Sequence, residues 1–169
     1  MPQGVNRLKK GILIPLIAIL VIILDVITKM IIVKQVAHHE IIKVLPFINI
    51  VHIENKGAAF GLFASLGNTF FIIISIVAIL FIIYYLKSVQ KRMEIISLSL
   101  VLGGAVGNFI DRIRLGKVTD FIDFYVNSWH WPSFNVADSA LTVGIIFFLW
   151  ANIFGSGHKK TSKTDSHLI

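Results

Sequence analysis

The sequence predicts a mainly α-helical membrane protein: a four-transmembrane-helix bundle with a small extracytoplasmic β-structure and an outer loop between helices three and four. Three observations support this fold class. Hydrophobic residues make up 56% of the 169 residues, whereas only 15% are charged. The apolar residues form runs that are long enough to cross a bilayer. Basic residues gather in the short segments that flank these runs.

Composition and charge exclude several classes of protein. A folded chain of this length keeps much of its surface exposed, so its surplus of apolar side chains needs lipid as a solvent. A net charge of +7 would suggest a nucleic-acid partner in a soluble protein. Here the charges flank apolar runs and indicate membrane topology, so we expect no nucleic acid. The absence of cysteine removes disulfides, thiolate metal sites and a cysteine nucleophile.

Four segments have the length and composition of membrane spans, which need roughly 20 apolar residues. They are residues 11–33, 68–86, 95–113 and 137–154. The first span follows several basic residues, as the apolar core of a cleaved signal peptide would. However, its apolar run continues well past a signal core and no small-x-small cleavage site follows, so we expect it to be retained.

Basic residues set the expected orientation, because short cytoplasmic segments carry an excess of lysine and arginine. They lie before span one, between spans two and three, and after span four: Arg7, Lys9, Lys10, Lys87, Lys91, Arg92, Lys159, Lys160 and Lys163. We therefore expect both termini in the cytoplasm, with residues 1–10 as a flank, 11–154 as a single four-span domain and 155–169 as a disordered tail. The connections at 34–67 and 114–136 then face outward.

The first outer connection has the residue pattern of β-strands. Residues 40–54 are rich in β-branched residues with partial alternation, which places Ile48, Ile50, His52 and Glu54 on one side. Pro46 puts a break or an edge there, so one or two short strands are expected. The second connection contains aromatic residues typical of a segment that rests at a membrane interface. They are Tyr125, Trp129 and Trp131.

Polar groups near the outer ends of the spans are candidates for a site. Asp25 and Lys29 are four residues apart in span one, so they share a helix face and form either a structural ion pair or part of a site. Asp111 and Arg112 in span three are likewise either a structural anchor or part of a binding site. Charged residues within a span are costly and usually face the bundle interior.

Glycines in span three predict close helix packing. Gly103 and Gly107 are four residues apart, with Gly104 beside them, and small residues at this spacing let helices approach each other. A close contact there would place Asn108 and Asp111, one turn further along, inside the bundle near the outer surface.

One aspartate lies within the second outer connection, and another lies just after it. Asp120 by itself is an ordinary loop acid. Asp138 stands at the start of span four, where Asn135 suits a helix cap and the helix dipole favours a negative charge. Because spans three and four are consecutive, the connection returns to the same membrane face, and two close carboxylates would share a proton. One carboxylate could then activate a water molecule while the other polarises a carbonyl oxygen. Together they could hydrolyse a peptide bond without a metal.

Other functions fit the sequence less well. The histidines of the outer connections could suggest zinc, but there is no HExxH motif, and adjacent His38 and His39 point differently on any regular element. We therefore expect neither a metal nor a cofactor. Ser139 has no His or Lys partner nearby in sequence, and no Walker loop occurs. Two non-peptidase alternatives are a small proton-coupled transporter that uses the outer acids and an assembly factor that docks partners on the outer strands.

Five stretches together resemble the motif set of one family. They are Asp25-Val-Ile-Thr-Lys29, Asn55-Lys-Gly-Ala-Ala-Phe60, Gly107-Asn-Phe-Ile-Asp-Arg112, Val118-Thr-Asp-Phe121 and Phe134-Asn-Val-Ala-Asp-Ser139. In this order on four spans, over about residues 12–154, they resemble lipoprotein signal peptidase, also called signal peptidase II. One departure is Val26, which stands where the family usually has glutamine.

The resemblance implies an aspartic endopeptidase of the bacterial cytoplasmic membrane, blocked by globomycin, with its site near the outer face. It implies removal of signal peptides from prolipoproteins by a cut just before a cysteine that already carries diacylglycerol. Asp120 and Asp138 match the family's catalytic aspartates, without a division of roles between them. Supporting polar residues of the family match Asp25, Asn55, Asn108, Asp111, Arg112 and Asn135. The resemblance also implies a β-cradle, here at about residues 37–65. As partners of a monomer we expect the lipid-modified prolipoprotein and membrane lipid.

Overall fold

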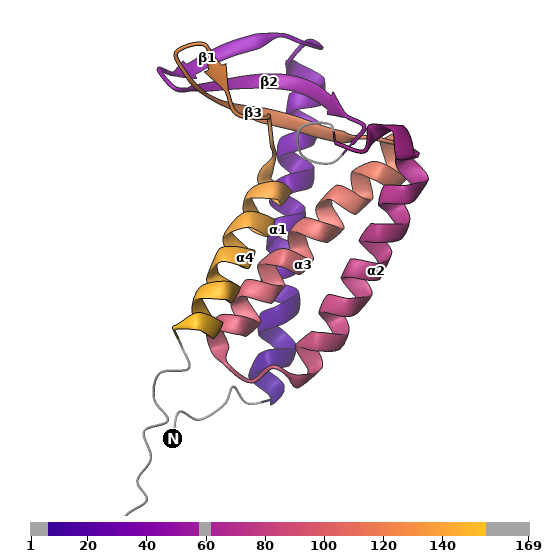
Figure 1. Ribbon diagram of the computed structural model, residues 1–169, viewed down its shortest axis with the longest axis vertical. Helices are drawn as coiled ribbons and strands as arrows, with labels where there is room; N and C mark the ends of the chain where they lie inside the picture. The colour runs from indigo at the N-terminus through magenta and orange to yellow at the C-terminus, as the bar shows by residue number, and fades with distance from the viewer. Residues whose placement is uncertain (1–6, 58–61, 155–169) are drawn as a thin grey trace, which may run out of the picture.

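The computed structural model describes residues 7–57 and 62–154, which form four long helices with a small sheet at one end of the bundle (Figure 1). The helices are α1, Arg7–Gln35; α2, Gly67–Ser88; α3, Arg92–Leu115; and α4, Val136–Ile153. Each is long and apolar enough to cross a membrane. The four predicted spans are thus confirmed, with ends that differ by a few residues. The predicted tail at 155–169 lies outside the described residues.

The central helix of the bundle is α3, which packs against α1, α2 and α4. Its glycines permit the closest approaches. A methyl group added at Gly103 would lie 2.8 Å from the Cβ atom of Val21, and one at Gly104 would overlap the carbonyl oxygen of Ala137. The expectation of close packing at this cluster is confirmed. It places the next turn of α3, with Asn108, between α1 and α4 at the end of the bundle that carries the sheet.

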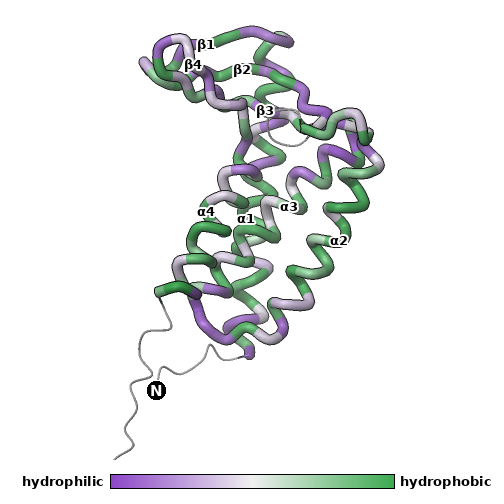
Figure 2. Tube along the Cα trace, in the orientation of Figure 1, coloured by the Kyte–Doolittle hydropathy of each residue, from purple (hydrophilic) through white to green (hydrophobic). Residues whose placement is uncertain are grey.

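The outward faces of the helices are apolar, as contact with lipid requires (Figure 2). Leu16 on α1 and Phe81 on α2 are examples, at 61% and 65% exposed. The end of the bundle away from the sheet is closed by Lys10, whose Nζ donates hydrogen bonds to the carbonyl oxygens of Lys87 at 3.0 Å and Val89 at 2.6 Å. This lysine satisfies acceptors that the last turn of α2 leaves free.

The sheet is antiparallel with the strand order β1-β2-β3-β4. Its strands are β1, Ile41–Leu45; β2, Ile48–Asn55; β3, Val118–Val126; and β4, Trp129–His130. The short strands predicted within residues 40–54 are confirmed as the hairpin β1–β2. The break predicted at Pro46 falls in the turn of this hairpin.

The connection between α3 and α4 differs from the expected loop. Nine of its residues form β3, which pairs along β2 with Asn49 opposite Asp123 and Ile53 opposite Asp120. The cradle therefore extends beyond the expected residues 37–65. The physical reason is that β2 has two edges, and its second row of backbone N–H and C=O groups needs a partner. The residues of β3 are mostly β-branched or aromatic, so they also favour a strand.

Candidate active site

Asp120 and Asp138 come from two elements that meet where the sheet joins the bundle. Asp120 lies in β3 and is only 2% exposed. Asp138 lies in the first turn of α4, where it forms a capping box with Asn135. In this box the backbone N–H of Asp138 donates to Asn135 Oδ1 at 2.8 Å, and the backbone N–H of Asn135 donates to Asp138 Oδ2 at 3.2 Å.

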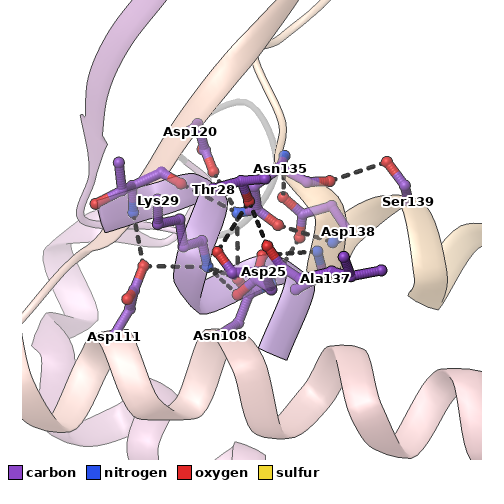
Figure 3. A network of polar contacts seen from close by, with 12 residues as sticks. Asp25, Thr28, Lys29, Asn108, Asp111, Asp120, Asn135, Ala137, Asp138 and Ser139 are labelled. Atoms are coloured by element: carbon purple, nitrogen blue, oxygen red, sulfur yellow. Dashed lines mark hydrogen bonds and ion pairs between the residues drawn. The ribbon is translucent and has the colours of Figure 1, made fainter. Parts of the chain in front are cut away.

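Asn135 joins the two aspartates (Figure 3). Its side chain is fully buried, and its Nδ2 donates to Asp120 Oδ1 at 2.8 Å while its Oδ1 caps α4 at Asp138. The same Nδ2 also approaches Asn108 Oδ1 at 3.2 Å and the carbonyl oxygen of Thr119 at 3.3 Å. One asparagine thus fixes the strand acid relative to the helix acid.

Two further side-chain amides donate hydrogen bonds to the remaining carboxylate oxygens of the pair. Asn55, at the end of β2, donates from Nδ2 to Asp120 Oδ2 at 2.9 Å. Asn108, on α3, donates from Nδ2 to Asp138 Oδ1 at 2.7 Å. Together with the bonds from Asn135, every oxygen of the two carboxylates accepts a hydrogen bond. These bonds restrict both carboxylates to one orientation.

The surroundings of Asp120 favour its protonated form near neutral pH. Burial, and after it the nearby negative charge of Asp138, raises the pKa of Asp120 from 3.8 to about 7. Hydrogen bonds from Asn55 and Asn135 and the charge of Lys29 act in the opposite direction without cancelling this shift. Asp120 can therefore carry a proton near neutral pH.

A second layer of charged groups lies beneath the pair, centred on Lys29. Its Nζ contacts Asp25 Oδ2 at 2.7 Å, Asp111 Oδ2 at 3.1 Å and Asn108 Oδ1 at 3.0 Å. Asp25 Oδ1 in turn accepts the backbone N–H of Ala137 at 2.9 Å. The predicted pair of Asp25 with Lys29 is confirmed as an ion pair. It ties α1 to the start of α4 and to the amide that holds Asp138.

Asp111 and Arg112 have different surroundings. Asp111 accepts the backbone N–H of Thr119 at 3.0 Å, which anchors the start of β3 to α3. The Arg112 guanidinium lies 4.3 Å from the ring centre of Phe71, and its Nη2 donates to the carbonyl oxygen of Gly57 at 2.7 Å. Its Nη1 is buried without a hydrogen-bond partner among the described residues.

The aspartate pair opens onto a cavity of about 840 Å³. The polar end of the cavity contains Asn55, Asn108, Arg112, Asp120 and Asp138. The remaining walls are largely apolar and come from α2 on one side of α3 and α4 on the other. They include Phe71, Ile74, Ala78, Leu141 and Val143. The cavity therefore joins a polar site at the sheet to an apolar channel between helices.

The predicted site residues lie together, with Asp25 and Asp111 in the layer behind the pair. Lys29, which links that layer, was missing from the predicted set, although its spacing from Asp25 already placed it on the same helix face. Asp123 lies apart, where it accepts hydrogen bonds from Asn49 Nδ2 at 2.8 Å and from His130 Nδ1 at 2.9 Å. Its separation from Asp120 follows from their odd spacing in one strand, which sends the two side chains to opposite faces.

Comparison with known proteins gives the following relatives. A family model described as signal peptidase (SPase) II matches residues 17–154. A lipoprotein signal peptidase of Thermodesulfovibrio yellowstonii is 46% identical over 135 residues, which cover 79% of this chain and 90% of that protein. One from Burkholderia thailandensis is 44% identical over 138 residues, covering 79% and 83%. A bacterial membrane enzyme solved by the in meso method superposes with a TM-score of 0.83 and 35% identity, over 98% of this chain and 99% of that one.

Proposed function

We propose that this chain hydrolyses the peptide bond of its substrate with an aspartate pair, Asp120 and Asp138. The chain belongs to the signal peptidase II family, and it removes signal peptides from prolipoproteins. The observation that carries this proposal is the hydrogen-bond network around the pair. Asn135 bonds to both acids, and separate amides from Asn55 and Asn108 hold their outer oxygens. Two carboxylates fixed in this way share one proton, which is the arrangement that aspartic peptidases use.

The geometry supports a division of labour in the resting state. Asp120 carries the shared proton, because burial and the charge of Asp138 raise its pKa to about 7. Asp138 lies at the N-terminus of α4, where the helix dipole and two N–H donors favour a negative charge, so we assign it the role of the ionised partner. The pair titrates as a unit, so the proton changes place during the cycle.

The reaction then proceeds without a covalent intermediate. Asp138 takes a proton from a water molecule while the water oxygen attacks the scissile carbonyl carbon. At the same time Asp120 gives its proton to the carbonyl oxygen. The resulting gem-diol collapses when Asp120 takes a hydroxyl proton back and Asp138 gives its proton to the leaving amide nitrogen. The C–N bond breaks, and the pair returns to its starting state. Arg112, which lines the cavity beside the aspartates, binds a neighbouring carbonyl oxygen of the substrate and keeps the peptide in place.

The cavity supports a lipid-modified substrate that is cut just before its diacylglyceryl cysteine. Its polar end holds the peptide bond at the aspartates, while its apolar walls from α2 and α4 suit acyl chains that stay in the membrane. We propose that the site faces outward from the bacterial cytoplasmic membrane, with both termini in the cytoplasm, and that the protein acts as a monomer. The family assignment leaves the transporter and assembly-factor alternatives without support.

Single substitutions of the two acids test the assignment. Asp120→Asn and Asp138→Asn should each reduce cleavage of a diacylglyceryl-modified precursor by at least about a thousandfold, since each removes a proton-transfer group. Asp123→Asn is the matched control, because it changes a buried acid of the same strand outside the cavity and should keep most of the activity. Circular dichroism in detergent should show the same helix content for all three. Normal cleavage by folded Asp138→Asn protein would refute the assignment.

A further inference from the structure

Two histidines and a glutamate converge on the outer sheet, away from the aspartate pair. His38 lies in the turn after α1, whereas His52 and Glu54 lie two residues apart in β2. One ligand atom from each residue, a ring nitrogen or a carboxylate oxygen, lies within 4.8 Å of the other two. The expectation from the sequence treated His38 and His39 as members of a regular element, but both lie in a turn. That turn brings His38 against His52, with their ring centres 5.3 Å apart and edge to face.

His52 is already held in the form that a metal ion needs. Its Nδ1 lies 3.0 Å from the carbonyl oxygen of Val36, and the bond is buried. A carbonyl can only accept, so Nδ1 carries a hydrogen, and Nε2 is the nitrogen through which this ring can bind a metal ion. Histidines that bind metal ions nearly always donate their other N–H to a carbonyl or carboxylate in this way. The backbone of α1 thus supplies the supporting bond.

Glu54 provides a charged oxygen at the same place. Its Oε2 is paired with Lys117 Nζ at 2.6 Å, and one of its carboxylate oxygens lies within 4.8 Å of a ring nitrogen of each histidine. The hydrogen bond from Lys117 holds the pKa of Glu54 below its ordinary value, and the two histidines add to this effect. A second cation at this carboxylate competes with the lysine.

We propose that His38, His52 and Glu54 form a binding site for a divalent transition-metal ion of the zinc class. Two imidazole nitrogens and one carboxylate oxygen suit zinc and its neighbours, whereas magnesium and calcium favour oxygen ligands alone. Tetrahedral zinc needs ligand atoms about 3.3 Å apart, which follows from bond lengths of about 2.0 Å. His38 is exposed on a turn, so rotation of its ring closes the remaining distance while the buried ring of His52 stays in place. Solvent takes the fourth position.

The site would connect the outer sheet to the aspartate pair. An ion bound there joins the turn after α1 to the last residues of β2, across a junction that already contains the His52–Val36 bond. The residue after Glu54 is Asn55, which donates to Asp120. Metal binding therefore stabilises the end of β2 that positions an active-site amide. This role is separate from the hydrolysis, to which the ion contributes no ligand or charge in the proposed mechanism.

Zinc binding to the full chain in detergent micelles tests the proposal, with a purification tag that contains no histidine. Calorimetric titration should show one zinc ion per chain and no response to magnesium. His38→Ala and Glu54→Gln should each weaken zinc binding by about tenfold or more. His38 is exposed and Glu54 is half-buried, so unchanged helix content and similar melting without metal will show that the variants fold. Cobalt substitution should give absorption bands of a low-symmetry site in the wild type that both variants lose.

Two further variants sharpen the result. Lys117→Met should tighten zinc binding, because Glu54 is then no longer shared with an ammonium group. His130→Asn is the matched control, since it removes an exposed imidazole elsewhere on the sheet and should leave the affinity unchanged. Absence of saturable zinc binding would overturn the proposal. So would wild-type affinity in both His38→Ala and Glu54→Gln, because the ion would then bind elsewhere on the chain.

Discussion

Replacing Asp120 with asparagine should change how the stability of the protein depends on pH. In the folded protein the pKa of Asp120 is about 7, whereas its ordinary value is 3.8. Below the lower value, the folded and unfolded states both carry the proton. Between the two values only the folded state keeps it, so the unfolded state gains stability by ionising. The contribution of Asp120 to the free energy of unfolding therefore falls as pH rises from about 4 to about 7, and then levels off.

The size of this effect follows from the shift itself. A change from 3.8 to about 7 corresponds to about 4 kcal/mol, at 1.36 kcal/mol for each pH unit. Asp120→Asn removes this pH-dependent loss. It also introduces a pH-independent cost of about 1–3 kcal/mol, because the new amide nitrogen faces the donor of either Asn55 or Asn135 and that donor loses its acceptor. The variant should therefore be less stable than the wild type near pH 4 and more stable near pH 8.

Unfolding in mixed detergent micelles, followed by tryptophan fluorescence at half-unit steps between pH 4 and 8, measures both curves. Ser139→Ala is the matched control, because Ser139 lines the same cavity but does not titrate. Its curve should run parallel to that of the wild type. Parallel curves for Asp120→Asn and the wild type would refute the reasoning, since Asp120 would then ionise in the folded state as it does in the unfolded one.

Three other substitutions test the layers around the pair. Lys29→Met leaves two buried carboxylates without a cation and should lower the free energy of unfolding by about 3–5 kcal/mol in the same micelles. A decrease of less than about 1 kcal/mol would contradict the central place of Lys29. Gly104→Ala pushes a methyl group into a backbone carbonyl of α4 and should cost about 1–3 kcal/mol, whereas Gly11→Ala, which has open space, should be neutral or slightly stabilising. Asn135→Ala should cost about 1 kcal/mol of unfolding free energy, because a helix cap is lost. It should also reduce kcat at least about tenfold with little change in KM. If kcat stays near the wild-type value in the folded variant, Asn135 acts only as a helix cap.

The membrane spans were predictable because lipid imposes a minimum length on every apolar run. Sequence also indicated that Asp25 and Lys29 pair, since their spacing alone places them on one helix face. The strand at Val118–Val126 was missed although its β-branched and aromatic residues favour a strand. Its aromatic neighbours suggested a membrane interface instead, and its pairing with β2 depends on where α3 ends relative to the first hairpin.

The detailed site depended on contacts that sequence spacing does not encode. Asn135 was expected as a helix cap, but its second bond to Asp120 exists only because β3 runs beside the start of α4. The convergence of His38 with His52 likewise depends on how β2 returns past the end of α1, where the backbone N–H of His39 bonds to the carbonyl of His52 at 3.2 Å. Neither approach follows from helix or strand periodicity.

The most direct test of the central claim is the pH dependence of kcat/KM for a diacylglyceryl-modified precursor. If Asp120 and Asp138 share one proton, the profile is bell-shaped, and activity falls as pH rises through about 7 because Asp120 loses the proton that it must donate. The unmodified precursor, measured in parallel, should be cleaved far more slowly at every pH. Activity that stays constant or increases between about pH 7 and 9 would contradict hydrolysis by this aspartate pair.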